Sequence, residues 1–109
     1  MRPICEDAWY VGWHSAPADR ADIAWLAPGS GLLKVWLEDI PPGVQLDLHL
    51  YDLADRRRPL QSATQPGVSS KDVGAAVIDG HTYAIVVLAQ SGESDAPYRL
   101  RWTLDRHWP

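Results

Sequence analysis

The sequence lacks several features that would place it in a specialised class of proteins. Its 109 residues include no phenylalanine, one methionine and one cysteine. Because Cys5 has no partner in the chain, no intrachain disulfide can form, and the class of small disulfide-stabilised domains is excluded. No apolar run approaches the ~20 residues that a membrane-spanning helix needs. Residues 1–13 lack a basic start followed by an apolar segment, so they do not predict a signal peptide.

Signatures of common catalytic, zinc and nucleic-acid sites are also missing. The net charge is −4, which does not suit a nucleic-acid binder. The four histidines are far apart and have no cysteine beside them, so nothing specifies a zinc site. Ser30, His49 and Asp47 supply the residue types of a catalytic triad, but no Gly-x-Ser-x-Gly turn is present. We therefore expect a protein that is not an enzyme.

What the sequence does contain is the alternation of a β-protein. In Gln45–Leu53, Leu46, Leu48 and Leu50 are spaced two residues apart, with polar residues or tyrosine between them. This period places the three leucines on one face of a strand that buries one side and exposes the other. A helix would scatter them over different faces. The segment predicts a central strand.

The same alternation recurs along the whole chain, and no segment shows a helical period. Turn signals separate the segments at intervals of about 8–12 residues, which is typical of a β-sandwich or barrel. The segments that predict strands are 8–13, 21–27, 32–38, 45–53, 60–63, 71–78, 81–90 and 98–104. With a hydrophobic content of 46%, residues 1–109 predict a single domain. We predict an all-β fold, an antiparallel two-sheet β-sandwich of seven or eight strands.

Three local predictions accompany this assignment. Asp79-Gly80 predicts a two-residue hairpin, and Gly12 predicts a bulge in the first strand or a close approach of another backbone segment. Met1–Asp7 and Ser91–Pro97 are polar and predict irregular segments.

From residue 19 to residue 103 the chain resembles the bacterial pre-peptidase C-terminal domain. The resemblance lies in the order of five motifs, since each motif alone is a generic strand pattern. They are Asp19–Trp25, the turn Pro28–Gly31 with the strand Leu33–Leu37, Asp47–Asp52, Gly80–Val87 and Tyr98–Leu100. The resemblance implies a sandwich of jelly-roll type, appended to a secreted peptidase or another extracellular enzyme. The sequence departs from the family pattern at Ala21, where an acidic residue is usual, and at Arg56–Arg58, where a glycine is usual.

Some relatives of this family bind calcium, and oxygen-rich clusters suit that ion. The candidate ligands in this sequence are Asp19, Asp22, Asp47 and Asp52. No EF-hand spacing connects them, and aspartates at strand ends commonly cap turns instead. Ala21 stands in the motif that would supply ligands, so both interpretations remain open.

The candidate binding residues are those that the alternation turns outward. If Leu33, Val35 and Leu37 are buried, Trp36 faces outward, and the same argument turns Asp47, His49 and Tyr51 outward. Trp36 and Tyr51 on adjacent strands would form an apolar platform for a sugar or a protein. Arg57, in the centre of the arginine run, would add a basic loop. The alternatives are that Trp9 and Trp13 cover Trp36, and that the arginine loop is merely solvated.

Two functions fit these residues. The resemblance implies a non-catalytic accessory module that recognises a polymeric substrate or surface, polysaccharide or protein, for an attached enzyme. The alternative is a structural or protein–protein interaction domain that docks on neighbouring domains of a larger intracellular bacterial protein. The family implies secretion, whereas the arginine loop and the absence of a predicted signal peptide favour the second function. Neither function involves a membrane or a nucleic acid.

Overall fold

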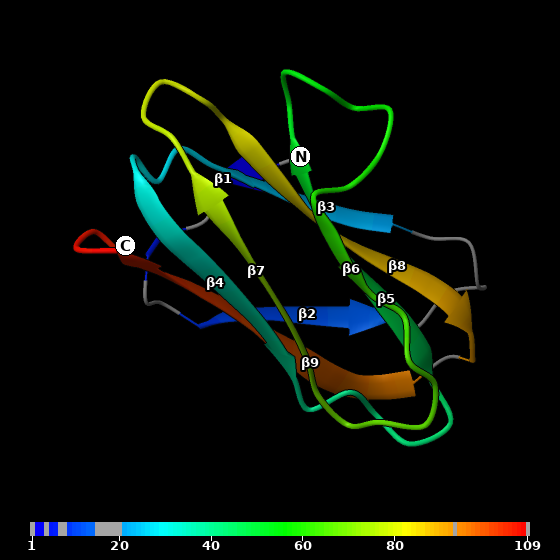
Figure 1. Cartoon of the computed structure of the whole chain (residues 1–109). Coiled ribbons are helices and arrows are strands. Elements are labelled where there is room, and N and C mark those ends of the chain that lie inside the picture. The colour runs from blue at the N-terminus through cyan, green and yellow to red at the C-terminus, as the bar shows by residue number, and fades with distance from the viewer. Residues whose placement is uncertain (1, 4, 7–8, 15–20, 93, 109) are drawn as a thin grey trace.

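The computed structural model describes residues 2–3, 5–6, 9–14, 21–92 and 94–108. It shows two β-sheets packed face to face, and the described residues contain no helix (Figure 1). None of these residues therefore belongs to a helix long and apolar enough to span a membrane. The strands are β1 (Arg2–Pro3), β2 (Tyr10–His14), β3 (Ala21–Leu26), β4 (Gly31–Glu38), β5 (Gln45–Asp52), β6 (Gln61–Ala63), β7 (Lys71–Val77), β8 (Tyr83–Ser91) and β9 (Ser94–Asp105). The predicted sandwich is confirmed.

The order of the strands shows that the chain passes from one sheet to the other at almost every connection. One sheet has five strands in the order β1-β3-β8-β5-β6, and the other has four in the order β2-β9-β4-β7. All pairs are antiparallel except β1 with β3. Within the described chain, the only consecutive strands that pair are β5 and β6. Strands that follow one another in sequence therefore mostly lie in opposite sheets.

The core lies between the two sheets and is built by alternate residues of each strand. Leu33, Val35 and Leu37 of β4 are fully buried. They face the β5 leucines, which are also buried, and Tyr83, Ile85 and Val87 of β8. Each such side chain stabilises the fold by about 1.5–3 kcal/mol through burial. Strand β9 adds the inward residues that the sequence predicts: Tyr98, Leu100, Trp102 and Leu104.

The prediction of a hairpin at Asp79-Gly80 is wrong. Strands β7 and β8, which flank this turn, lie in different sheets and do not pair. The turn itself is present, because Gly80 has a φ of +88° and the His81 backbone N–H donates to the Ile78 carbonyl. A tight turn signal specifies the local reversal, and it says nothing about which sheet receives the next strand.

Two segments predicted to be irregular contain strand. Within Met1–Asp7, Arg2–Pro3 pairs in parallel with β3 at Ala24 and Trp25. Within Ser91–Pro97, β9 already begins at Ser94. The register of β2 with β9 also shifts between Gly12 and His14, where a step of two residues on β2 faces a step of four on β9, from Tyr98 to Ser94. The extra residues therefore lie on β9, and the prediction of a bulge in the first strand at Gly12 is wrong.

The loop between β5 and β6, residues 53–60, rises at the top of the molecule (Figure 1), and hydrogen bonds hold its base. Asp52 accepts one from the Ala54 backbone N–H at 2.9 Å and one from His81 Nδ1 at 2.8 Å. The Leu60 N–H donates to the Leu50 carbonyl at 2.7 Å, which fixes the other end of the loop. Burial of the Asp52 carboxyl raises its pKa, but the hydrogen bonds from Ala54 and His81 outweigh this effect, so the pKa lies below its ordinary value.

We expect the substitution Asp52→Asn to remove stability that depends on pH. Because the pKa of Asp52 is lowered by folding, its contribution is fully present above the unfolded-state value of about 3.9 and is lost as the pH falls through the folded-state value. At pH 7 the variant should be less stable by about 1–2 kcal/mol. In urea denaturation experiments, the difference in the free energy of unfolding between the variant and the unsubstituted chain should shrink toward pH 2.5. Asp72→Asn, at an exposed carboxylate, is the control and should show little difference at either pH. An Asp52→Asn deficit of equal size at both pH values contradicts the prediction.

A second prediction concerns Gly92, which closes the turn after β8. Its φ is +79°, and a Cβ at this position would lie 2.2 Å from the Gly43 carbonyl oxygen. Gly67 has a similar φ of +75° with open space around it. Gly67→Ala should therefore cost only the conformational penalty of about 1 kcal/mol. Gly92→Ala should cost at least about 3 kcal/mol, because backbone atoms must also move. If urea denaturation gives the two variants equal losses in the free energy of unfolding, the backbone at Gly92 and Gly43 can move apart and the prediction is wrong.

Candidate functional site on the outer face of the five-stranded sheet

The outer face of the five-stranded sheet carries an unusual number of apolar side chains. Directly opposed residues of antiparallel strands share a face. The outward residues therefore form rows across the sheet. One row joins Tyr51 of β5 to Ala84 of β8 and Trp25 of β3, and the next joins His49, Val86 and Ile23. Because this face would be in water, polar side chains are expected at most of these positions.

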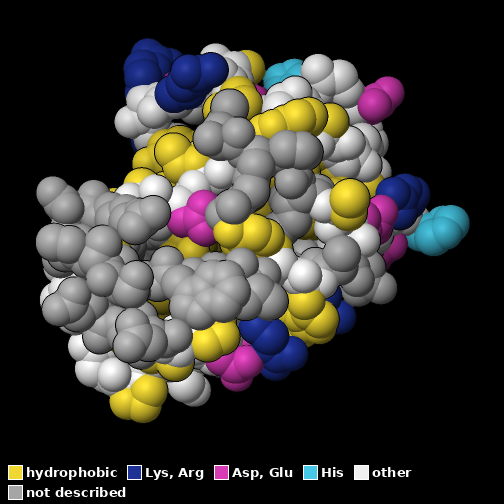
Figure 2. All heavy atoms as spheres, turned by 180° about the vertical axis from the view of Figure 1, so that it is seen from behind, with side chains coloured by type: hydrophobic (Ala, Val, Ile, Leu, Met, Phe, Trp, Pro, Cys, Tyr) yellow, Lys and Arg dark blue, Asp and Glu magenta, His cyan; other side chains and the backbone are white. Residues whose placement is uncertain are grey.

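Part of this face is hollowed into a pocket of about 250 Å³. Its lining comes from three strands and the β5–β6 loop: Ile23, Tyr51, Leu53, Arg56, Ala84 and Val86. Of the side chains in this lining, only those of Tyr51 and Arg56 carry polar groups. Figure 2 shows Lys and Arg side chains grouped at the upper left of the molecule, with hydrophobic side chains directly below them. This pocket is the candidate site.

The three consecutive arginines, Arg56–Arg58, differ in their contacts. Arg57, the predicted binding residue, is bonded to the Asp55 carboxylate through Nε at 3.1 Å and Nη2 at 3.3 Å. Arg56 and Arg58 are exposed and form no ion pair or hydrogen bond within the described residues. Arg56 is also the member that lines the pocket. The positive charge available at this site is therefore that of Arg56, whereas the charge of Arg57 is already paired.

The prediction that Asp47 faces outward into solvent is wrong, because the residue is buried. Its carboxylate accepts a hydrogen bond from Gln45 at 2.8 Å and lies 3.6 Å from Lys71 Nζ. The Lys71 ammonium, which is also buried, donates to the Leu46 carbonyl. Burial lowers the pKa of Lys71, and the charge of Asp47 opposes this shift. Asp47 thus neutralises a buried lysine and is not accessible to a ligand.

His49 lies beside Tyr51, with the two ring centres 6.3 Å apart. Its Nδ1 is hydrogen-bonded to the Ser62 hydroxyl of the edge strand β6 at 2.7 Å. Ser30 accepts a hydrogen bond from the Asp79 backbone N–H instead. Ser30, His49 and Asp47 therefore each have other partners, and these contacts do not build a triad. A binding role for His49 and Tyr51 stays a prediction.

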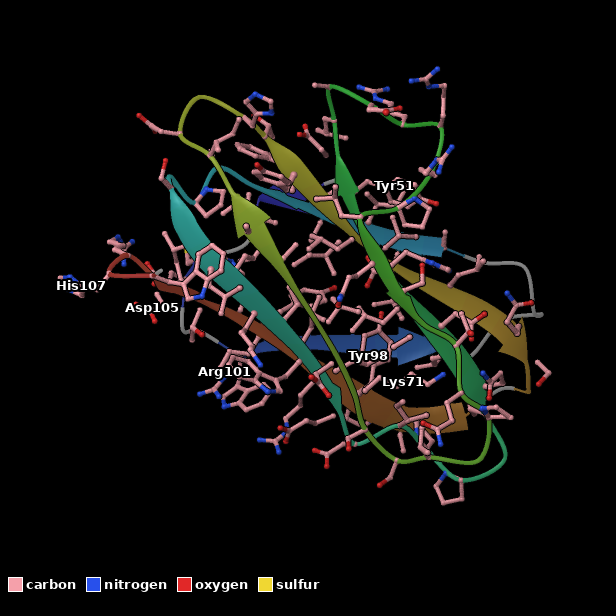
Figure 3. All side chains as sticks on the ribbon, viewed as in Figure 1. Tyr51, Lys71, Tyr98, Arg101, Asp105 and His107 are labelled. Atoms are coloured by element: carbon pink, nitrogen blue, oxygen red, sulfur yellow. The ribbon has the colours of Figure 1, made fainter. Side chains whose placement is uncertain are left out.

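The platform predicted from Trp36 and Tyr51 is wrong. Trp36 is on β4 and Tyr51 is on β5, and these strands belong to different sheets. Tyr51 and Arg101, which is opposite Trp36 on the neighbouring strand β9, lie on opposite sides of the sandwich in Figure 3. The alternation correctly turns both aromatic residues outward, but the outward faces are different ones.

Trp36 is partly covered by a stack of aromatic and guanidinium groups. The Arg101 guanidinium lies 4.7 Å from the Trp36 ring centre and 4.9 Å from the Trp9 ring centre. Arg99 follows on Trp9 at 4.4 Å. Arg101 therefore links Trp9 of the N-terminal segment to Trp36. That the segment covers Trp36, as in the alternative interpretation, stays a prediction. The side chain of Trp13 lies outside the described part of the chain.

Three of the four carboxylates proposed for calcium have separate partners. Asp22 accepts hydrogen bonds from the Tyr98 hydroxyl at 2.6 Å and the Tyr10 hydroxyl at 3.4 Å. Asp47 and Asp52 bind the partners given above, and Asp19 lies outside the described residues, as does Arg20. Among the described residues, no group of three or more His, Cys, Asp or Glu side chains is arranged to hold a metal ion. Calcium binding stays a prediction.

Sequence reasoning missed most of the residues around the pocket. Arg56 could not be distinguished from its two arginine neighbours, and Ile23 belongs to a strand that is remote from Tyr51 in sequence. One signal was available: residues 84, 86 and 88 are apolar on the second face of the segment 81–90. The structure shows that this second face forms part of the pocket.

No protein-family model matches the sequence, and no curated protein matches it. Solved structures do match the fold. The pre-peptidase C-terminal domain of a collagenase from Bacillus anthracis superposes with a TM-score of 0.74 at 13% identity, over 94% of this chain and 93% of that one. PliG of Aeromonas hydrophila, a periplasmic inhibitor of g-type lysozyme, superposes with a TM-score of 0.64 at 11% identity, over 94% of both chains. At these identities the likeness concerns the fold alone, and the chain has the fold of a pre-peptidase C-terminal domain.

Proposed function

We propose that this chain is a non-catalytic accessory module that binds a polymeric substrate or a surface for an attached enzyme. The observation that carries the proposal is the apolar pocket on the outer face of the five-stranded sheet. Apolar surface that is open to water on a small domain commonly marks an interaction site. Tyr51, which lines this pocket, combines a large apolar ring with a hydroxyl and so suits a partly wet contact.

The fold neighbours support this proposal in a general way. One is a domain of a collagenase, so the same fold serves as part of a larger enzyme. The other is an inhibitor of a lysozyme, so the fold also serves to bind another protein.

A second candidate is a protein–protein interaction domain that docks on neighbouring domains of its parent protein. The aromatic and guanidinium stack on the four-stranded sheet favours it, because Trp9 is 39% exposed and tryptophan and arginine are frequent at protein interfaces. This surface lies on the opposite side of the sandwich from the pocket. The two candidates therefore use different residues and can be separated by mutation.

We expect the chain to be retained on insoluble polymer and Tyr51→Ala to weaken this retention. Insoluble collagen, chitin and cellulose are the test polymers, and the loss should be about tenfold, as for truncation of an aromatic contact residue. Trp36→Ala, on the opposite face, is the matched control and should bind as the unsubstituted chain does. Thermal melting of both variants checks that they fold. If none of the polymers retains the unsubstituted chain, or if Tyr51→Ala binds normally, the accessory-module proposal fails.

A further inference from the structure

We propose that the pocket takes a large apolar side chain of a protein segment while Arg56 binds a carboxylate beside that side chain. The partner is then an accessible, acidic stretch of polypeptide in which an apolar residue is flanked by Asp or Glu. This inference rests on the proposed function, because it assumes that the outer face of the five-stranded sheet is the binding surface. It goes further by naming the class of partner.

The size of the pocket supports a single side chain as its occupant. Its volume of about 250 Å³ is below the roughly 300–1,000 Å³ of sites that enclose whole small molecules. Ile23, Ala84 and Val86 form a wall from two adjacent strands, and Leu53 extends it onto the loop. A pocket of this kind removes one apolar group from water and leaves the rest of the partner outside.

The chemistry of the walls favours polypeptide over polysaccharide. A sugar ring presents hydroxyl groups, which lose hydrogen bonds to water when they enter a hydrocarbon pocket. Among the side chains of the lining, only Tyr51 and Arg56 carry polar groups, and Tyr51 is the one aromatic ring. An aliphatic or phenyl side chain has no hydroxyl groups and therefore loses no hydrogen bonds to water when it enters the pocket.

The charge at the rim selects an acidic partner. Arg56 lines the pocket and has no ion pair among the described residues, whereas Arg57 beside it is bonded to Asp55. A guanidinium presents a planar set of donors that matches a carboxylate. Arg56 and Arg58 provide two unpaired charges, fewer than the 4–8 typical of segments that bind anionic membranes.

The loop that carries Arg56 is anchored at both ends. Asp52 and His81 fix its start, and the Leu60–Leu50 backbone hydrogen bond fixes its end. A second backbone hydrogen bond joins the Leu53 N–H to the Thr82 carbonyl at 2.9 Å. Since less freedom is lost on binding when a loop is already held, this arrangement favours recognition by Arg56.

The test uses a fluorescein-labelled peptide, Gly-Ser-Asp-Phe-Asp-Ser-Gly, and measures its anisotropy with the full chain. One comparison peptide has both aspartates replaced by lysine, and another has phenylalanine replaced by glycine. We expect the acidic, apolar peptide to bind at least about fivefold more tightly than either, and binding to weaken as NaCl is raised from about 50 to 500 mM.

The decisive variants are Arg56→Glu and Arg57→Glu, which make the same charge change at neighbouring positions. The Arg56→Glu variant should bind the acidic peptide at least fivefold more weakly than the unsubstituted chain does. It should also bind the lysine peptide more tightly than the acidic one. Arg57→Glu, away from the pocket lining, should keep the preference for the acidic peptide. The inference is overturned if the two variants behave alike, or if the unsubstituted chain does not distinguish the three peptides. It is also overturned if vesicles containing phosphatidylserine, and no peptide, bind in an Arg56-dependent manner.

The failure of this inference can be told from a failure of the proposed function. If Tyr51→Ala loses retention on collagen, chitin or cellulose while the peptides are not distinguished, the binding face stands and the acidic-segment inference falls. If the unsubstituted chain binds neither polymer nor peptide, both fall. Retention on chitin or cellulose alone would assign the pocket to polysaccharide and overturn the inference.

Discussion

The shared core between the two sheets is the interaction on which the rest of the structure depends. Each long strand contributes alternate side chains to it, and those of β4, β5, β8 and β9 are almost completely buried. Because neighbours in sequence mostly enter opposite sheets, nearly every pairing within a sheet joins strands that are not consecutive in the chain. The burial of one apolar face per strand thus fixes which side chains remain outside, and these are the residues available for binding.

The outward residues divide into two surfaces with different properties. On the four-stranded sheet, the Arg101 guanidinium lies over the rings of both Trp36 and Trp9, so the charge of this arginine is already engaged. On the five-stranded sheet, Tyr51 borders an open pocket beside Arg56. The first surface attaches the N-terminal segment to the sandwich. The second retains both an apolar cavity and an unpaired charge, which is why we assign binding to it.

The sequence predicts the strands and their inward residues well, because burial of Leu46, Leu48 and Leu50 follows from local alternation. It could not predict that β4 and β5 lie in different sheets, since sheet membership is decided by long-range pairings such as β5 with β8. The Trp36–Tyr51 platform failed for this reason. Arg56 could not be predicted for a different reason. Three consecutive arginines are equivalent in the sequence, and only the position of Asp55 in the structure shows which of them is paired.

The buried Lys71 has a consequence for the open edge of the five-stranded sheet. Strand β6 pairs only with Leu48–Leu50, so among the described strands it leaves the beginning of β5 uncovered. An uncovered strand offers backbone groups to which a foreign strand can add. At this point the Leu46 carbonyl already accepts a hydrogen bond from Lys71, and the neighbouring Asp47 is occupied by the same ammonium group. A strand added here would have to displace this buried charge pair, which disfavours the addition of a strand at this edge.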